Sequence, residues 1–165
     1  MKTFPPILAL LACAFTAVLV CGCSKSDPRA ASTDRSAAKH EHKAPHGGTA
    51  VVLGNEAYHL ELVRDAATGK LTVFVLDGEM ENFIRAKTRS FEIVATVGGA
   101  PRPLVLQAVA NPATGETVGD SSCFETQADW LKTTPVFDAV LTTLEIRGTT
   151  FAAVPFNFPK GNDKD

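Results

Sequence analysis

The stretch YHLELVRDAATGKLTVFVL, residues 58–76, carries the clearest structural signal in this chain. Apolar and polar side chains alternate through residues 58–63, which is the two-residue period of a β-strand. Residues 71–76 are rich in β-branched and aromatic side chains, which strands favour. Between these segments DAATGK supplies turn residues, and Gly69 can adopt the positive φ that a tight hairpin needs. The sequence therefore predicts an antiparallel β-hairpin here.

The alternation in the first of these strands divides its side chains between two faces. Tyr58, Leu60 and Leu62 are predicted to share one face, and His59 and Glu61 the other. An antiparallel strand that is covered on one side points its polar residues to solvent, which favours an exposed position for His59 and Glu61. The alternative is that these two side chains, about 7 Å apart along the strand, share a metal ion or a bound water.

Strand and turn signals continue outward from the hairpin. Further strands are predicted at residues 49–53, 90–97, 103–110, 122–126, 137–146 and 149–158, and a single helical turn capped by Asp129 at residues 129–132. Turn signals recur roughly every 8–12 residues, and no alternation of strands with long helices is present. This pattern is typical of an all-β protein, and we expect an antiparallel β-sandwich (Ig-like) of seven or eight short strands.

The N-terminal end of the chain looks like a targeting segment rather than part of this fold. The apolar run over residues 7–20 resembles the core of a signal peptide, since a transmembrane span needs roughly 20 apolar residues. It ends in LVCGCS, residues 19–24, which resembles the lipobox of bacterial lipoproteins. The resemblance implies cleavage after residue 22 and lipid attachment to Cys23, with Cys21 as the rival position.

The lipobox also implies where the protein lies and how it is organised. A lipid on Cys23 would make the membrane a partner and would place the protein in the cell envelope. Ser24 resembles an outer-membrane sorting signal, on the periplasmic side if the host is Gram-negative. We therefore expect a lipoprotein signal peptide at residues 1–22 and a flexible, disordered linker that tethers the domain at residues 23–44. The β-sandwich domain would follow at residues 45–160, and residues 161–165 would form a disordered tail.

Charge and cysteine content narrow the classes of function. The net charge is −2 and no dense basic block is present, which argues against nucleic acid as a partner. After signal-peptide cleavage and lipidation, Cys123 would be the remaining thiol. It is interpreted as a buried small apolar residue, an intermolecular partner or a ligand, and burial is favoured because free cysteine is among the most buried residue types.

All four histidines lie between residues 40 and 59, at His40, His42, His46 and His59. His40 and His42 can both bind one ion if the backbone is extended, and a mobile leader could bring in His46 as a third ligand. Neutral imidazole suits Cu(II), Zn(II) and Ni(II). If His59 takes part, it should lie close to His46 in the folded domain. The alternative is a solvated tether that contains histidine, because the spacing of a structural zinc site is missing.

Other candidate chemistry is weaker. The acidic turn DGEME, residues 77–81, lacks the ligand spacing of a calcium loop, although Met80 could serve Cu(I); an acidic hairpin tip is the simpler interpretation. The chain contains no GxSxG, HExxH or glycine-rich phosphate loop, so we predict that it is not an enzyme. Catalysis by Cys123 would need a neighbouring base and a polar pocket around the thiol.

Part of the domain resembles known bacterial sequences. PHGG at residues 45–48, YHLEL at residues 58–62 and LTVFVLD at residues 71–77 resemble a block found in small periplasmic lipoproteins. A similar block accompanies the periplasmic adaptor subunits of heavy-metal efflux systems. The resemblance implies a β-rich periplasmic domain and favours His46 and His59 as metal ligands. It does not extend beyond residue 90, and the coiled-coil hairpin of a whole adaptor is missing.

Two functional hypotheses follow. The first is an accessory metal-binding lipoprotein for Cu or Zn, in which His40, His42 and His46 capture the ion and His59 completes the site. The second is a structural or interaction lipoprotein that docks onto an envelope protein or a metal-efflux component, with incidental histidines. Metal binding predicts that His46 and His59 lie close together, whereas docking predicts an exposed apolar patch or an open strand edge.

Overall fold

The structure is a computed structural model that describes residues 43–163. Cys23, His40 and His42 lie outside the described residues. The strands are β1 Thr49–Leu53, β2 Tyr58–Asp65, β3 Lys70–Asp77, β4 Ser90–Val97, β5 Ala100–Ala108, β6 Cys123–Gln127, β7 Phe137–Ile146 and β8 Thr149–Phe158. One short 3-10 helix, η1, spans Asp129–Lys132. The prediction of an all-β, antiparallel fold is confirmed.

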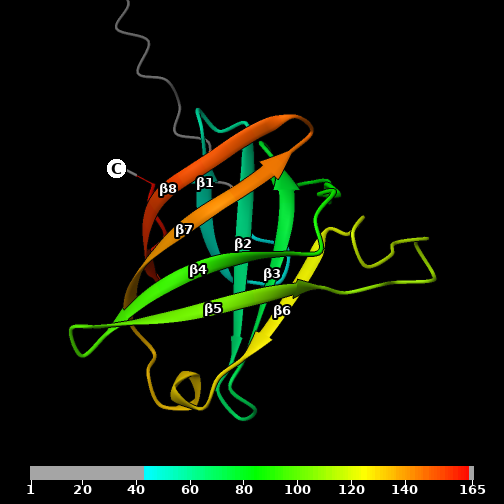
Figure 1. Cartoon of the computed structure of the whole chain (residues 1–165). Coiled ribbons are helices and arrows are strands. Elements are labelled where there is room, and N and C mark those ends of the chain that lie inside the picture. The colour runs from blue at the N-terminus through cyan, green and yellow to red at the C-terminus, as the bar shows by residue number, and fades with distance from the viewer. Residues whose placement is uncertain (1–42, 164–165) are drawn as a thin grey trace, which may run out of the picture. The chain divides into compact units, whose positions relative to one another are not determined.

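The arrangement of the strands differs from the expected two-sheet sandwich. All eight strands belong to one antiparallel sheet in the order β1-β2-β3-β6-β5-β4-β7-β8, which curls round a common core (Figure 1). The two ends of the sheet meet where Thr49, at the start of β1, donates a hydrogen bond from Oγ1 to the carbonyl of Pro159, which follows β8, at 3.2 Å. The sheet is therefore a nearly closed barrel, which the twist accumulated over many strands allows and a pattern of short strands alone does not reveal.

The residues after β8 complete this closure. The Asn162 side chain accepts a hydrogen bond from Val52 N at 2.7 Å and donates one to Val52 O at 3.1 Å. Gly161 and Asn157 exchange two backbone hydrogen bonds, of 2.7 and 2.9 Å. A Cβ on Gly161 would clash with the Ala50 carbonyl oxygen, so the close approach requires glycine. The prediction of a frayed tail is therefore wrong for Gly161 and Asn162.

The predicted hairpin is confirmed as the pair β2 and β3. Tyr58 pairs with Asp77 and Asp65 with Lys70, as the sequence pattern requires. In the turn, Gly69 has φ +72°. The Asp65 side chain accepts a hydrogen bond from Ala67 N at 2.8 Å, and this turn chemistry sets the register of the two strands.

The core lies inside the curled sheet and is lined by alternate residues of each strand. Leu60 and Leu62 of β2 are fully buried, as their predicted face requires. The short helix η1 adds Leu131 to the core. Its N-cap is Ala128, without a side-chain hydrogen bond, so the predicted capping by Asp129 is wrong. Asp129 instead accepts a hydrogen bond from Lys132 Nζ at 2.8 Å.

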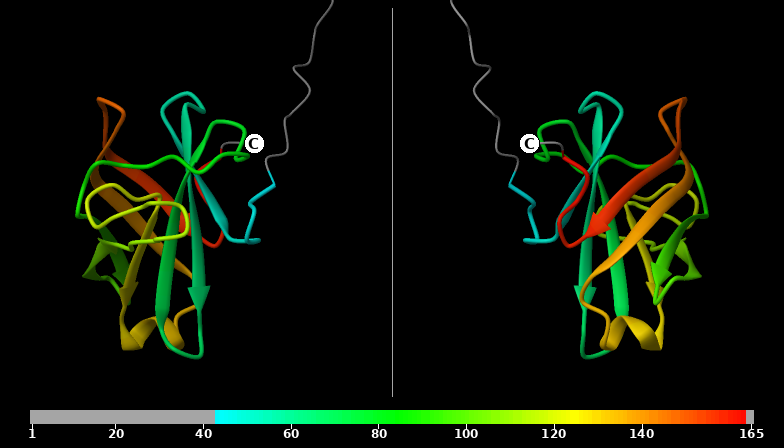
Figure 2. Two further views of the ribbon diagram at one scale, coloured as in Figure 1. Left: turned by 90° about the vertical axis from the view of Figure 1, so that its right-hand side faces the viewer. Right: turned by 90° about the vertical axis from the view of Figure 1, so that its left-hand side faces the viewer.

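The described residues 43–163 contain the eight strands and one hydrophobic core. Within residues 43–163, no helix is long and apolar enough to cross a membrane. Figure 2 shows the loop after β5 (yellow-green) standing beside the loop between β3 and β4 (green). Ala86 and Ser121 form an antiparallel bridge between these loops.

Candidate functional site

The outer face of β2 is covered, contrary to the expectation for an exposed polar face. His59 is 1% exposed and Glu61 is 0% exposed. The cover above Glu61 is the segment just before β1, residues 44–48, which bonds to its carboxylate. The sequence pattern placed His59 and Glu61 correctly on the face opposite Leu60 and Leu62. It could not show that a second layer lies over them.

Glu61 is the centre of this contact. Its Oε1 accepts hydrogen bonds from His46 N at 2.7 Å and Gly48 N at 2.9 Å. Its Oε2 lies 2.8 Å from His46 Nδ1. Because an ionised carboxylate only accepts hydrogen bonds, we assign the proton of this contact to Nδ1, so that Nε2 is the acceptor nitrogen whenever the ring is neutral.

Two glycines make this contact possible, each for a different reason. Gly47 has φ +68° and closes a turn by donating from its N to the Ala44 carbonyl at 3.0 Å. Gly48 lies so close to β2 that a Cβ would stand 2.6 Å from Leu62 O and 2.9 Å from Glu61 Cγ. The PHGG motif is therefore a docking element that brings the end of the leader onto β2.

The His46 ring is positioned by aromatic contacts as well as by the contact of Nδ1 with Glu61. It stacks on Phe74 of β3 with ring centroids 4.0 Å apart and planes 13° apart. Phe83, from the loop after β3, approaches the same ring at 5.8 Å. The His46 side chain nevertheless remains 41% exposed. Within the described residues, its ring hydrogen bond runs through Nδ1.

The structure places His59 against different partners from those of His46. His59 Nδ1 lies 3.3 Å from the Asp77 carbonyl oxygen, inside the sheet. Within residues 43–163, no group of three or more His, Cys, Asp and Glu side chains is arranged to hold a metal ion. His46 is thus the one of the four candidate histidines that the structure describes at the surface.

The acidic turn after β3 is an ordered structural turn. The Asp77 carboxylate accepts hydrogen bonds from Glu81 N at 2.9 Å and from Asn82 Nδ2 at 2.6 Å. Burial by itself would raise the pKa of Asp77, but the hydrogen bonds from Asn82 and Glu81 outweigh it and hold the pKa below its usual value. Met80 is only 2% exposed and packs inward.

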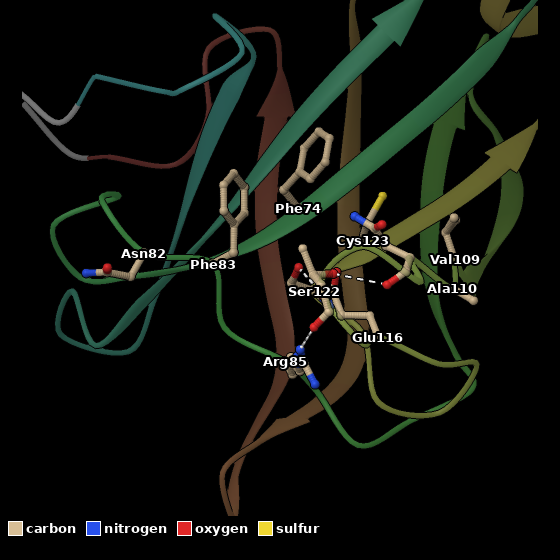
Figure 3. A pocket seen from close by; sticks show the side chains of 11 residues that line it. Phe74, Asn82, Phe83, Arg85, Val109, Ala110, Glu116, Ser122 and Cys123 are labelled. Atoms are coloured by element: carbon tan, nitrogen blue, oxygen red, sulfur yellow. Dashed lines mark hydrogen bonds between the residues drawn. The ribbon is translucent and has the colours of Figure 1, made fainter.

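A hollow of about 650 Å³ opens beside the His46 contact, between β3, β6 and the two long loops (Figure 3). Its lining includes Phe74, Phe83, Arg85, Val109, Glu116 and Cys123. Cys123 is half-buried and lies directly across the strand pair from Phe74. Burial, followed by the charges of Glu125 and Glu116, raises the pKa of the Cys123 thiol to about 11, so the thiol stays protonated at neutral pH.

The far wall of the hollow is built by the loop between β5 and β6. Glu116 Oε1 accepts hydrogen bonds from Ser122 N at 2.7 Å and Ser122 Oγ at 2.6 Å, and Oε2 accepts one from Thr114 Oγ1 at 2.7 Å. Burial would raise the pKa of Glu116, but these bonds and Arg85 together lower it below its usual value. Arg85 binds the Thr114 carbonyl and ties the two loops together.

Apart from Cys123, the residues of this hollow were not identified as candidates from the sequence. Residues 111–120 look like an ordinary turn-rich loop, and residues 79–87 show no clear period. Neither segment carries a motif that would pair Arg85 with the distant loop. Comparisons with protein-family models, curated proteins and solved structures give no match for this chain.

Proposed function

We propose that this protein is a lipid-anchored envelope protein that binds a divalent metal ion, Cu(II) or Zn(II), with His46 as its oriented ligand. His40 and His42 supply further ligands. The observation that supports this proposal best is the contact of His46 Nδ1 with the buried Glu61 carboxylate, at 2.8 Å. Histidines that bind metals commonly donate their second ring N–H to a carboxylate in this way.

The physical argument concerns the state of the ring before the metal arrives. A metal ligand must be neutral imidazole, and Glu61 selects the tautomer that leaves Nε2 as an acceptor. Stacking on Phe74 at 4.0 Å holds the ring plane, so less conformational entropy is lost on binding. The ring remains accessible, with 41% of the side chain exposed.

The other two ligands precede His46 by four and six residues in the sequence. An extended chain spans about 3.3–3.6 Å per residue, so His42 and His40 can both fold back onto an ion that is bound at His46. His59, which was expected to complete the site, is 1% exposed, and its Nδ1 lies 3.3 Å from the Asp77 carbonyl oxygen. The proposal therefore rests on His40, His42 and His46 as ligands and does not depend on His59. The proposed site therefore combines His40 and His42, which precede the domain, with the oriented ring of His46.

The membrane anchor in this proposal rests on the lipobox-like LVCGCS, residues 19–24, with Cys23 as the lipidated residue. Lipidation would hold the metal site close to a membrane, on the periplasmic side of the outer membrane in a Gram-negative host. A metal-efflux component or another envelope protein would be the partner that receives the ion. Mass spectrometry of the mature protein tests the anchor, since a diacylglycerol-modified N-terminal Cys23 has a characteristic mass.

Calorimetric titration of the protein from Ser24 onward tests the metal site. Cu(II) and Zn(II) are titrated in competition with a weak chelator, into the unaltered protein and into a variant with His40, His42 and His46 all changed to Ala. We expect one-to-one, sub-micromolar binding that this triple variant loses. Glu61→Gln should weaken binding about tenfold, because the carboxylate orients the ring.

The matched control is Glu145→Gln, which alters an exposed glutamate on β7, a strand that does not pair with β2. It should bind metal as the unaltered protein does, and circular dichroism should show that each variant remains folded. Binding that is weak, or indifferent to the three histidine substitutions, contradicts the metal function.

A second candidate, docking onto an envelope protein, is favoured by one observation. A row of apolar side chains crosses the outer face of four strands, with each residue directly opposite the next: Pro103, Val94, Val140 and Pro155. Val140 is 39% exposed. The edge of β1 offers no free site at Val52, because Asn162 occupies its backbone groups. This candidate would replace the metal function if the titration fails.

A further inference from the structure

The hollow beside β6 has the size of a small-molecule site, and aromatic side chains line one side of it. Its volume of about 650 Å³ falls within the usual range for such sites, roughly 300–1,000 Å³. It is bounded by Phe74 and Phe83 on one side, by Val109 and the loop after β5 on the other, and by Cys123 between them (Figure 3).

The protein covers only part of the aromatic surface that lines the hollow. Phe83 meets Phe74 at 5.8 Å with planes 61° apart, yet Phe83 remains 48% exposed. An aromatic side chain with this much free surface gains most from a second flat ring that covers it. The neighbouring Cys123 thiol is uncharged at neutral pH and adds a soft, weakly polar surface to the same side.

The charged groups of the lining are already paired within the walls. Arg85 binds the carbonyl oxygens of Thr114 and Gly115 and the Asp120 carboxylate. Glu116 accepts three hydrogen bonds, two from Ser122 and one from Thr114. A charged ligand would therefore have to break an existing pair or enter without a counter-charge, and both are costly in a partly apolar site.

We propose that this hollow binds an uncharged, planar aromatic molecule, which stacks against Phe83 and lies over Cys123. The hollow lies beside the metal site at His46, and Phe74 and Phe83 contact both. The ligand would bury the exposed face of Phe83, and the paired charges of Arg85 and Glu116 would remain in place at the rim.

Fluorescence titration with phenylnaphthylamine, an uncharged aromatic dye, tests the proposal on the protein from Ser24 onward. We expect saturable one-to-one binding in the micromolar range, and at least tenfold weaker binding in Phe83→Ala. The matched control is Val140→Ala, which removes an exposed apolar side chain of similar exposure on another face and should leave the dye affinity unchanged. The anionic dye anilinonaphthalene sulfonate should bind more weakly.

A second measurement locates the dye. In the protein from Ser24 onward, Cys123 is the single thiol, and its maleimide labelling should slow as the dye concentration approaches saturation. Equal dye binding by Phe83→Ala, tighter binding of the anionic dye, or unprotected labelling of Cys123 overturns the proposal. Displacement of the dye by a long aliphatic alcohol in preference to naphthalene would also overturn it, because the site would then select an acyl chain. The metal titration alters His40, His42, His46 and Glu61 instead of Phe83, so its outcome is read separately from these results.

Discussion

Strands β2 and β7 alternate in sequence in the same way, but their outer faces have opposite environments. In β2 the outward residues His59 and Glu61 are buried. In β7 the outward residues Asp138, Val140 and Glu145 are exposed. Both strands line the same core with their other face. The difference between them therefore comes from what lies above the sheet and not from the strands themselves.

The comparison shows that a buried carboxylate needs a covering segment that supplies hydrogen-bond donors to its oxygens. Glu61 can be buried because residues 46 and 48 direct two backbone N–H groups and one ring nitrogen at its oxygens. Over β7 no comparable segment lies within the described chain, and its polar residues remain in water. A polar residue in a period-two strand is therefore compatible with either environment.

The largest expected effect comes from removing the carboxylate beneath the cover. Glu61→Ala leaves the N–H groups of His46 and Gly48 without an acceptor at a buried interface, so we expect a loss of about 3 kcal/mol in unfolding free energy. Glu145→Ala on the open face should change it by less than about 0.5 kcal/mol. Urea denaturation of both variants measures the difference, and similar values would mean that the two faces are equivalent.

A smaller effect is expected from filling the space between the cover and the strand. Gly48→Ala places a Cβ 2.6 Å from Leu62 O, and forcing the segment away should cost about 2 kcal/mol. Gly47→Ala meets nothing within 4 Å but must keep φ +68°, so about 1 kcal/mol is expected. Thermal and urea denaturation compare the two. A larger cost at Gly47 would show that turn conformation, rather than contact with β2, limits docking.

The smallest effect concerns a second covered carboxylate, Glu116, and depends on pH. Its pKa is lowered from 4.5 in the folded protein, so its contribution is complete above about pH 4.5 and is lost as the pH falls through the folded value. Glu116→Gln should therefore be less stable than the unaltered protein near pH 7, by about 1 kcal/mol, and the difference should shrink on acidification. Denaturation curves from pH 7 to pH 3 test this, and a constant difference would contradict it.

Much of the local structure is determined by the sequence. The β2–β3 hairpin follows from alternating side chains around a DAATGK turn, and Gly69 has the positive φ that its position predicts. The all-β class follows from the same short-range signals repeated along the chain. These features depend on neighbours within a few residues, and side-chain periodicity and turn chemistry report such neighbours directly.

Only the tertiary structure decided the features that join distant segments. The burial of Glu61 depends on a segment 13 to 15 residues away in sequence, and barrel closure depends on Asn162, which is 110 residues from Val52. The hollow exists because Arg85 ties its own loop to the carbonyls of Thr114 and Gly115. Such contacts arise when accumulated sheet twist brings loops together, and no local pattern records which loops will meet.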